Sequence, residues 1–273
     1  MPVAIFNGAR EAEPIVYFLP SYLQAEQTNN NYQRLMDRLN AYQLANSVQA
    51  LFYYQGEADT MSEINASSWS DNFGTLMDSW SASFPNLRNV YLTQIRGCTG
   101  RPYTSAVREQ QRQLGNTSHR TLGVQVMSTT AMDGFDGGCH FFYEGYKQLG
   151  GWYATLLMHD FYGGSAANAT APAPQSIRKG ANGTTLLIDL ANKTDPMTVA
   201  GASKADFFIT SRAGLVYQPT KVTASKGLIT LTLPAGATAV SVSYRGEASK
   251  GTAFITNGAG IGLLAFEGLP VTQ

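Results

Sequence analysis

The chain has 273 residues, no net charge at pH 7 and only 14% charged residues, so it lacks the basic excess typical of nucleic-acid partners. Its 44% content of hydrophobic residues is typical of a globular protein and argues against disorder. The sequence contains no run of about 18 apolar residues, so we expect no membrane partner.

The first 162 residues alternate short apolar runs with stretches of helical periodicity. Strands are predicted at residues 3–6, 50–54, 90–95 and 122–127, and helices at 32–48, 68–84, 103–114 and 142–161. Such alternation favours βαβ units, in which a parallel sheet carries helices on both faces. Residues 14–20 are apolar and begin and end with proline, so they predict a surface-crossing segment or the start of a short helix.

Residues 163–172 are small, polar and proline-containing, which indicates a linker. Residues 173–273 lose the helical periodicity and predict an accessory β-domain. Its strands are expected at 184–190, 206–209, 228–233, 239–244 and 262–266, separated by Gly, Pro, Asn and Ser. This pattern is typical of a small antiparallel β-sandwich, and the region contains neither His nor Cys.

Three polar side chains, Gln55, Glu57 and Asp59, directly follow the apolar run that ends at Tyr54. Ligands of open α/β sheets bind beyond the carboxyl ends of the strands, so this turn is a candidate site floor. The alternative is an ordinary strand followed by a polar loop.

A second cluster surrounds His140, which follows a predicted strand in a glycine-rich turn that also contains Asp136. A histidine in this setting could act as a general base, oriented by a carboxylate. The alternative is a histidine that caps or packs the start of the next helix. Cys139 and His140 are adjacent, and the sequence has no C-x-x-C or H-x-x-x-H pattern, so neither a metal site nor another cofactor is predicted.

The two cysteines, Cys98 and Cys139, both lie in loops that follow predicted strands. They allow one disulfide bond or two free buried thiols, and the sequence leaves both alternatives open.

Four features together resemble a known family. They are the block Tyr54-Gln55-Gly56-Glu57-Ala58-Asp59, the helical Arg108-Glu109-Gln110-Gln111, the loop from Asp136 to His140, and the C-terminal stretch from Thr256 to Pro270. The chain resembles the SGNH (GDSL-like) hydrolases and, within them, the carbohydrate acetylesterases that include sialate O-acetylesterases and acetyl xylan esterases. The resemblance implies a flavodoxin-like three-layer α/β sandwich over residues 1–162, followed by the β-sandwich domain.

The same resemblance implies an esterase that removes acetyl groups from carbohydrate without a cofactor. The composition, rich in Tyr, Asn, Ser, Thr and Gly and poor in Lys, resembles that of secreted or periplasmic proteins. In that family a serine attacks the acetyl carbonyl, a histidine takes its proton, and a carboxylate holds the histidine. Carried over, His140 would be the base, and Glu57 or Asp136 its carboxylate. Gln55, Gly56 and Asn7 would bind the substrate.

The sequence departs from the family pattern in three places. The serine block belongs before the strand predicted at residues 3–6, so this sequence is expected to lack the family nucleophile. Glu11 and Ala12 occupy positions where the family has glycines. Asp136 stands four residues before His140 instead of three, which favours Glu57 as the carboxylate.

Two other functions stay open on these grounds. One is a catalytically inactive relative that binds carbohydrate, and the other is a β-domain that only buries an apolar flank of the hydrolase domain. A sheet without its first strand would expose an edge, so a homo-oligomer that covers it is a further expectation.

Overall fold

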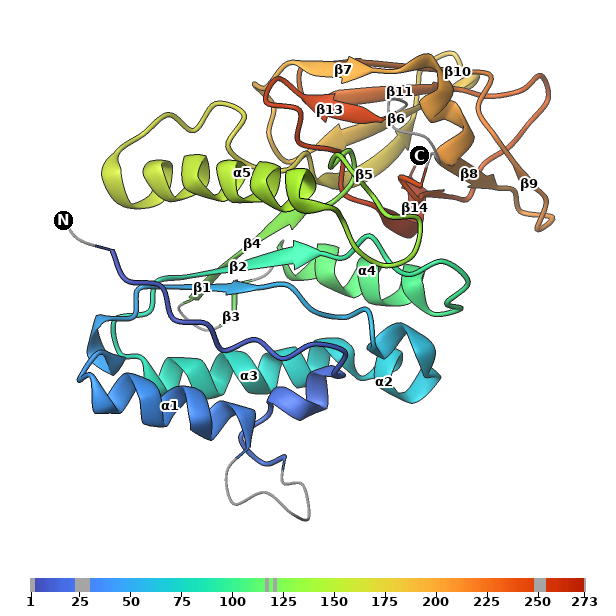
Figure 1. Cartoon of the computed structure of the whole chain (residues 1–273). Coiled ribbons are helices and arrows are strands. Elements are labelled where there is room, and N and C mark those ends of the chain that lie inside the picture. Colours follow the sequence, from blue (N-terminus) through green and yellow to red (C-terminus); the bar gives the residue numbers. More distant parts are fainter. Residues whose placement is uncertain (1–2, 23–29, 116–117, 120–121, 248–253, 273) are drawn as a thin grey trace. The chain divides into compact units, whose positions relative to one another are not determined.

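A computed structural model describes residues 3–22, 30–115, 118–119, 122–247 and 254–272. The chain forms two compact units, Met1–Gln125 and Val126–Gln273, and each is described by itself (Figure 1). The division falls within a strand. The boundaries predicted from the sequence, at residues 162 and 173, stay a prediction.

The first unit is built on a parallel sheet, as the alternating pattern predicted. Its strands are β1 (Ala50–Tyr53), β2 (Asn89–Gln94), β3 (Ser118–His119) and β4 (Leu122–Ser128), in the order β1-β2-β4-β3. Strands β1 and β2 are parallel, with Ala50 opposite Asn89, whereas β3 pairs with β4 in the antiparallel direction. The carboxyl ends of β1 and β2 therefore lie at the same edge of the sheet.

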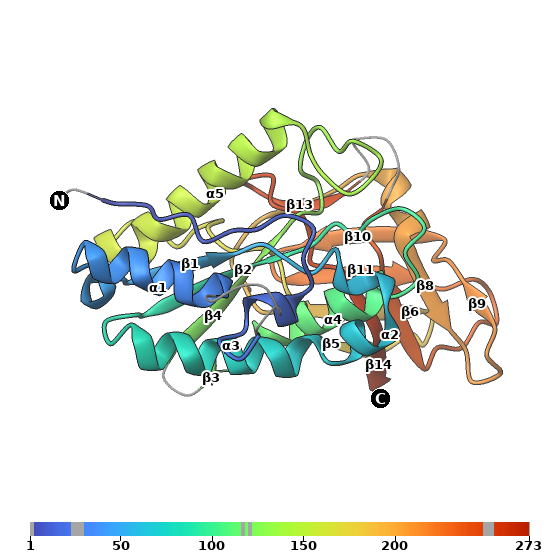
Figure 2. The ribbon, with the colours of Figure 1, turned by 60° about the horizontal axis from the view of Figure 1, so that its bottom comes forward.

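The α-helices of this unit are α1 (Asn31–Ala41), α2 (Glu63–Ser67), α3 (Trp69–Ser83) and α4 (Thr104–Leu114). Short 3₁₀ helices occupy Ile15–Phe18, Ala45–Ser47 and Asp59–Met61. The Asn30 side chain caps α1 by accepting a hydrogen bond from the Gln33 N–H at 2.8 Å. Figures 1 and 2 show α1 and α3 running alongside each other, and the Tyr32 hydroxyl joins them by a 2.8 Å bond to the Ser79 carbonyl.

The core of the first unit gathers on one face of α3. Five apolar residues at helical spacing are all buried, and they are Trp69, Phe73, Leu76, Met77 and Trp80. The aromatic rings among them contact one another and the ring of Tyr53 on strand β1. The Tyr53 ring lies 5.5 Å from that of Phe73, and the Trp69 and Phe73 rings stack at 5.2 Å. Buried aromatic side chains contribute a large part of the hydrophobic stabilisation of a small unit.

The strand predicted at residues 3–6 is wrong. These residues form no ladder, and the Val3 and Ile5 side chains are 72% and 92% exposed. The segment contacts α1 instead, where the Phe6 ring lies 6.1 Å from that of Tyr42 and the Asn7 carbonyl accepts a 2.9 Å bond from Arg38. An apolar run predicts an extended segment, but it does not provide a neighbouring strand to pair with.

The second unit begins with the end of β4 and contains the 20-residue helix α5 (Tyr143–Tyr162), which ends at Gly163 in the left-handed conformation. Its strands are β5 (Pro174–Lys179), β6 (Thr185–Leu190), β7 (Met197–Val199), β8 (Phe207–Thr210), β9 (Val216–Tyr217), β10 (Lys221–Ser225), β11 (Leu228–Thr232), β12 (Ser241–Tyr244), β13 (Ile255–Asn257) and β14 (Phe266–Thr272), and a 3₁₀ helix spans Gly201–Asp206. Eight strands form one curled sheet in the order β10-β11-β6-β5-β14-β12-β8-β9, and β13 pairs with β7.

The curled sheet differs in detail from the antiparallel sandwich that the sequence predicts. One pairing within it, β14 with β5, is parallel. The strand expected at 262–266 begins only at Phe266 and runs to Thr272. Buried side chains from strands in both halves of the sheet share one core, among them Ile188, Phe207 and Tyr244. The layout as a sandwich stays a prediction.

The segment predicted as a linker is held by hydrogen bonds. The Asn257 side chain donates to the carbonyls of Asn168 and Thr170 at 3.3 and 3.0 Å, and the Leu264 N–H donates to the Pro172 carbonyl at 3.0 Å. Ala169 and Ala171 are buried. Residues 165–172 therefore pack as part of the second unit. In the part of the chain that the structure describes, no helix has the length and apolarity needed to cross a membrane.

Candidate active site

The turn after β1 is organised by the side-chain amide of Gln55. Its Nε2 donates to the Glu13 carbonyl at 3.1 Å and to a carboxylate oxygen of Asp59. Its Oε1 accepts from the indole N–H of Trp69 at 3.1 Å and from the Tyr53 hydroxyl at 3.4 Å. An amide offers two donors and two acceptor positions, so protein groups occupy all four. The side chain is 7% exposed.

Asp59 is completely buried next to Gln55. Both of its carboxylate oxygens lie 3.1 Å from the Ile15 N–H, which donates to them. Burial raises the pKa of Asp59, although the bonds from Gln55 and Ile15 act in the opposite direction. Through Gln55 and Asp59, the turn fastens the segment around Glu13 and Ile15 to the carboxyl end of β1.

Gly56 is required in this turn for two reasons. Its φ is +137°, a conformation that L-residues rarely adopt, and a Cβ atom there would lie 2.9 Å from Nε2 of Gln111. That same nitrogen donates a 2.9 Å bond to the Gln55 carbonyl, and Oε1 of Gln111 accepts one from the Ile95 N–H at 2.9 Å. Gln111 on α4 therefore connects the ends of β1 and β2.

Glu57 is half-buried, and its backbone carbonyl accepts bonds from Arg101 at 2.8 Å and from the Thr60 hydroxyl at 2.6 Å. Burial raises the pKa of the Glu57 carboxyl to about 7, and the charge of Asp59 adds to the rise, against a backbone hydrogen bond and the Arg101 guanidinium. A carboxyl group with this pKa exchanges a proton at neutral pH, which is a property of general acids and bases.

In the second unit, Asp136 and His140 occupy one tight loop. The Asp136 carboxylate accepts from the Gly138 N–H at 2.7 Å and from the His140 N–H at 3.1 Å. Burial alone would raise the pKa of Asp136, but these bonds and the nearby His140 ring lower it below its ordinary value. The His140 side chain is exposed. The carboxylate of Asp136 thus fixes the backbone that carries His140.

The structure brings together some of the predicted site residues. Gln55, Gly56 and Glu57 share the turn after β1, whereas Asp136 and His140 share the loop before α5. Because these groups belong to separate units, a site that combines Glu57 with His140 stays a prediction. Asn7 is exposed, and its Oδ1 accepts a 2.8 Å bond from the Ala9 N–H.

Sequence reasoning missed how Trp69 and Gln111 take part in this region. The helical spacing of Trp69 predicts a core residue, and in the structure its indole N–H also orients the Gln55 amide. Gln111 belongs to the helical motif Arg108-Glu109-Gln110-Gln111. The spacing of this motif does not indicate that the partners of Gln111 are backbone groups at the ends of two strands. The sequence carries no signal for this role, because the burial of Gln111 is visible only in the structure.

Both cysteines, Cys98 and Cys139, are disulfide-bonded, which answers the question that the sequence left open. Among the described residues, no group of three or more His, Cys, Asp or Glu side chains is arranged to hold a metal ion.

Comparison with known proteins identifies a family. The family model described as carbohydrate esterase, sialic acid-specific acetylesterase, matches residues 6–159. No curated protein matches the chain. Among solved structures, a carbohydrate acetylesterase from Xanthomonas citri is similar, with a TM-score of 0.68 and 16% sequence identity over 87% of this chain. The match covers 53% of that protein, so this chain spans about half of its length. A protein from Arabidopsis thaliana gives a TM-score of 0.44 and 22% identity, over 55% of this chain and 58% of the other.

Proposed function

The chain belongs to the carbohydrate esterase family of sialic acid-specific acetylesterases, and on this premise we propose that it hydrolyses acetyl esters of carbohydrates. The observation that carries the proposal is the family match over residues 6–159, which includes the turn after β1 and the loop of His140. The fold shared with the Xanthomonas citri enzyme supports the same reaction class. Fold alone does not assign a reaction, so the residues must carry the rest.

In the proposed reaction, His140 acts as general base toward the hydroxyl group that attacks the acetyl carbonyl. It then returns the proton to the departing sugar oxygen, which releases the alcohol and leaves the acetyl group on the attacking hydroxyl. The same base next takes a proton from a water molecule, which attacks this acetyl group and releases acetate. The exposed position of His140 supports this role, because a base must reach its substrate. The Asp136 carboxylate supports it indirectly, since it holds the backbone N–H of His140 at 3.1 Å.

Glu57 is the better candidate for the carboxylate that orients His140. The Asp136 carboxylate already accepts two backbone bonds, and it stands four residues before His140 instead of three. Gln55, Gly56 and Asn7 are proposed to line the acetyl-binding side of the site. The proposal takes the nucleophile to be a hydroxyl group and assigns it to no particular residue.

We also propose a secreted or periplasmic location and a homo-oligomer. Disulfide bonds persist mainly in oxidising compartments, and both cysteines are disulfide-bonded.

Among the described strands, β1 has a neighbour on one side only, and Phe52 on it is 48% exposed. A second copy that covers this edge would remove a surface prone to aggregation. Light scattering that gives the mass of a single chain would contradict the oligomer.

The second candidate function is carbohydrate binding without hydrolysis. Its support comes from Gln55, whose amide is fully engaged by Glu13, Asp59, Trp69 and Tyr53. The Gln55 amide could polarise an acetyl carbonyl only by giving up one of these bonds. A protein of this type would bind acetylated carbohydrate and release no acetate.

Turnover of an activated aryl acetate tests the proposal, with wild type measured beside His140→Ala. Loss of a general base lowers the rate by about 100-fold or more. His159→Ala is the matched control, because the His159 ring bonds to its neighbour Asp160 at 2.7 Å near the end of α5. Equal rates for wild type and His140→Ala would refute His140 as the base. Binding of acetylated carbohydrate without any turnover would establish the second candidate.

A further inference from the structure

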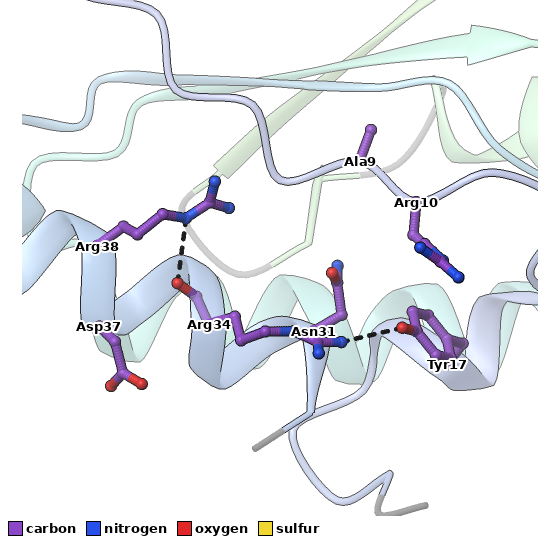
Figure 3. A pocket seen from close by; sticks show the side chains of 7 residues that line it. All are labelled: Ala9, Arg10, Tyr17, Asn31, Arg34, Asp37 and Arg38. Atoms are coloured by element: carbon purple, nitrogen blue, oxygen red, sulfur yellow. Dashed lines mark hydrogen bonds between the residues drawn. The ribbon is translucent and has the colours of Figure 1, made fainter. Parts of the chain in front are cut away.

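A cavity of about 550 Å³ lies on the first unit, between the segment that carries Arg10 and the helix α1 (Figure 3). The residues that decide its chemistry are Arg10, Tyr17, Asn31, Arg34, Asp37 and Arg38. A volume of this size falls in the range of pockets for small molecules and exceeds the space that a single ion needs. The proposed acetylesterase residues are not among those that line it.

The cavity is strongly basic for a chain with no net charge. The lining contains three guanidinium groups and one carboxylate, which gives it a net charge of +2. The Asp37 carboxylate accepts a 2.7 Å bond from the Gln33 side chain, and Figure 3 shows it directed away from Arg10 and Tyr17. The net positive charge of the lining can therefore attract an anionic ligand.

The arginines of the cavity are held in place by hydrogen bonds. Arg34 donates from Nη2 to the Tyr17 hydroxyl at 3.0 Å, as Figure 3 shows. Arg38 donates from Nη2 to the Asn7 carbonyl at 2.9 Å and from Nε to the Arg34 carbonyl at 3.2 Å. These bonds use one of the five N–H groups of Arg34 and two of those of Arg38, so further donors remain.

The wall opposite α1 is also fixed at both ends. The Asn31 side chain donates to the Gly8 carbonyl at 2.8 Å. A few residues on, the Glu13 carbonyl and the Ile15 N–H are bonded to Gln55 and Asp59 in the turn after β1. The cavity is thus formed by a segment that is tied to α1 on one side and to the end of β1 on the other, which favours a preformed site.

We propose that this cavity binds a small ligand that bears an oxyanion, either a carboxylate or a phosphate. The planar fork of a guanidinium matches both groups by paired hydrogen bonds. The residues proposed for ester hydrolysis do not line this cavity, so the proposal goes beyond the proposed esterase function and does not depend on it.

Calorimetric titration of the full chain at low ionic strength tests this site with glucuronate, glucose and inorganic phosphate. Glucuronate and glucose differ in the carboxylate, so we expect glucuronate to bind at least tenfold more tightly, and less tightly as salt is added. Binding of glucuronate alone would identify a carboxylate ligand, and binding of phosphate alone a phosphate ligand. The proposal is overturned if neither glucuronate nor phosphate binds more tightly than glucose. Absence of binding by all three compounds is included in that result.

Variants locate the binding. Arg34→Gln and Arg10→Gln each remove one charge and are expected to weaken oxyanion binding about tenfold. Arg10 is exposed and holds no hydrogen bond or ion pair among the described residues, so its replacement leaves the fold intact. Arg212→Gln, in an exposed turn of the second unit, is the matched control. Wild-type affinity in both cavity variants would refute the site, whatever the esterase assay shows.

Discussion

The side-chain amide of Gln111 donates a 2.9 Å hydrogen bond to the backbone carbonyl of Gln55, and its oxygen accepts another from the Ile95 N–H. One side chain on α4 thus completes the hydrogen bonding of two neighbouring strand ends. Gln111 is fully buried, so water cannot replace it. The turn that carries Gln55, Gly56 and Glu57 depends on this bond for its position.

Replacement of Gln111 by leucine should therefore destabilise the protein. Gln111→Leu leaves a buried carbonyl and a buried N–H without partners, which costs about 2–4 kcal/mol in free energy of unfolding. Urea unfolding followed by tryptophan fluorescence measures the change. Gln113→Leu is the control, because Gln113 is exposed on the same helix and its side chain donates to Glu109 of that helix. A Gln111→Leu variant as stable as Gln113→Leu would contradict this role.

Gly56→Ala should cost stability for a separate reason. A Cβ atom at φ +137° is strained, and it would displace the Gln111 amide, from which it would lie 2.9 Å away. We expect a loss of about 2–4 kcal/mol. Gly100→Ala separates strain from contact, since Gly100 has φ +77° and nothing within 4 Å of the added atom. Its expected loss is about 1 kcal/mol. Equal losses in the two variants would show that contact with Gln111 plays no part.

The sequence predicted the parts of the fold that follow from local patterns. The helix at Trp69–Ser83 and the strand at Ala50–Tyr53 were confirmed because their apolar residues are spaced to fill a core from one face. Residues 3–6 show the same apolar character without a strand, since pairing depends on a neighbour that spacing does not reveal. Strand β5 was missed because its residues Pro174–Lys179 are mostly polar.

The candidate site was only partly predictable for a related reason. Gln55 was located from its motif, but its partners Trp69 and Glu13 lie 14 and 42 residues away in the sequence. Motif spacing identifies which residues take part, whereas their roles depend on tertiary contacts. The assignment of Gln55 to substrate binding follows from the motif alone, which does not reveal the four protein partners of its amide.

The cysteines give a test that needs no variant. Because Cys98 and Cys139 are disulfide-bonded, a thiol-specific reagent should find no free thiol in the denatured, unreduced protein. After reduction it should find both cysteines of the chain. Two thiols before reduction would contradict the disulfide, and they would also remove the support for an oxidising compartment.

The two candidate carboxylates can be ranked by activity. If Glu57 orients His140, Glu57→Ala should lower kcat on an activated aryl acetate by about 100-fold. Asp136→Asn keeps an oxygen that can accept from the Gly138 and His140 N–H groups, so we expect less than about a tenfold loss. Circular dichroism checks that both variants fold. The reverse ranking would assign the carboxylate role to Asp136.

The raised pKa of Glu57 predicts a stability that falls as pH rises. The ordinary pKa of this carboxyl in the unfolded chain is 4.5, and in the folded protein it is about 7. Between these values the folded state binds more protons than the unfolded state, so the free energy of unfolding decreases with increasing pH. The limit is about 3 kcal/mol, and partial hydration of the half-buried group reduces it.

Glu57→Gln removes this titration. The variant should match wild type near pH 4 and exceed it by about 1–3 kcal/mol at pH 8, in urea unfolding measured at intervals across that range. Glu144→Gln is the control, because the Glu144 side chain is 68% exposed and its pair with Lys147 is long at 3.7 Å, so its replacement should change stability by less than about 0.5 kcal/mol at any pH. Parallel pH profiles for wild type and Glu57→Gln would contradict the raised pKa of Glu57.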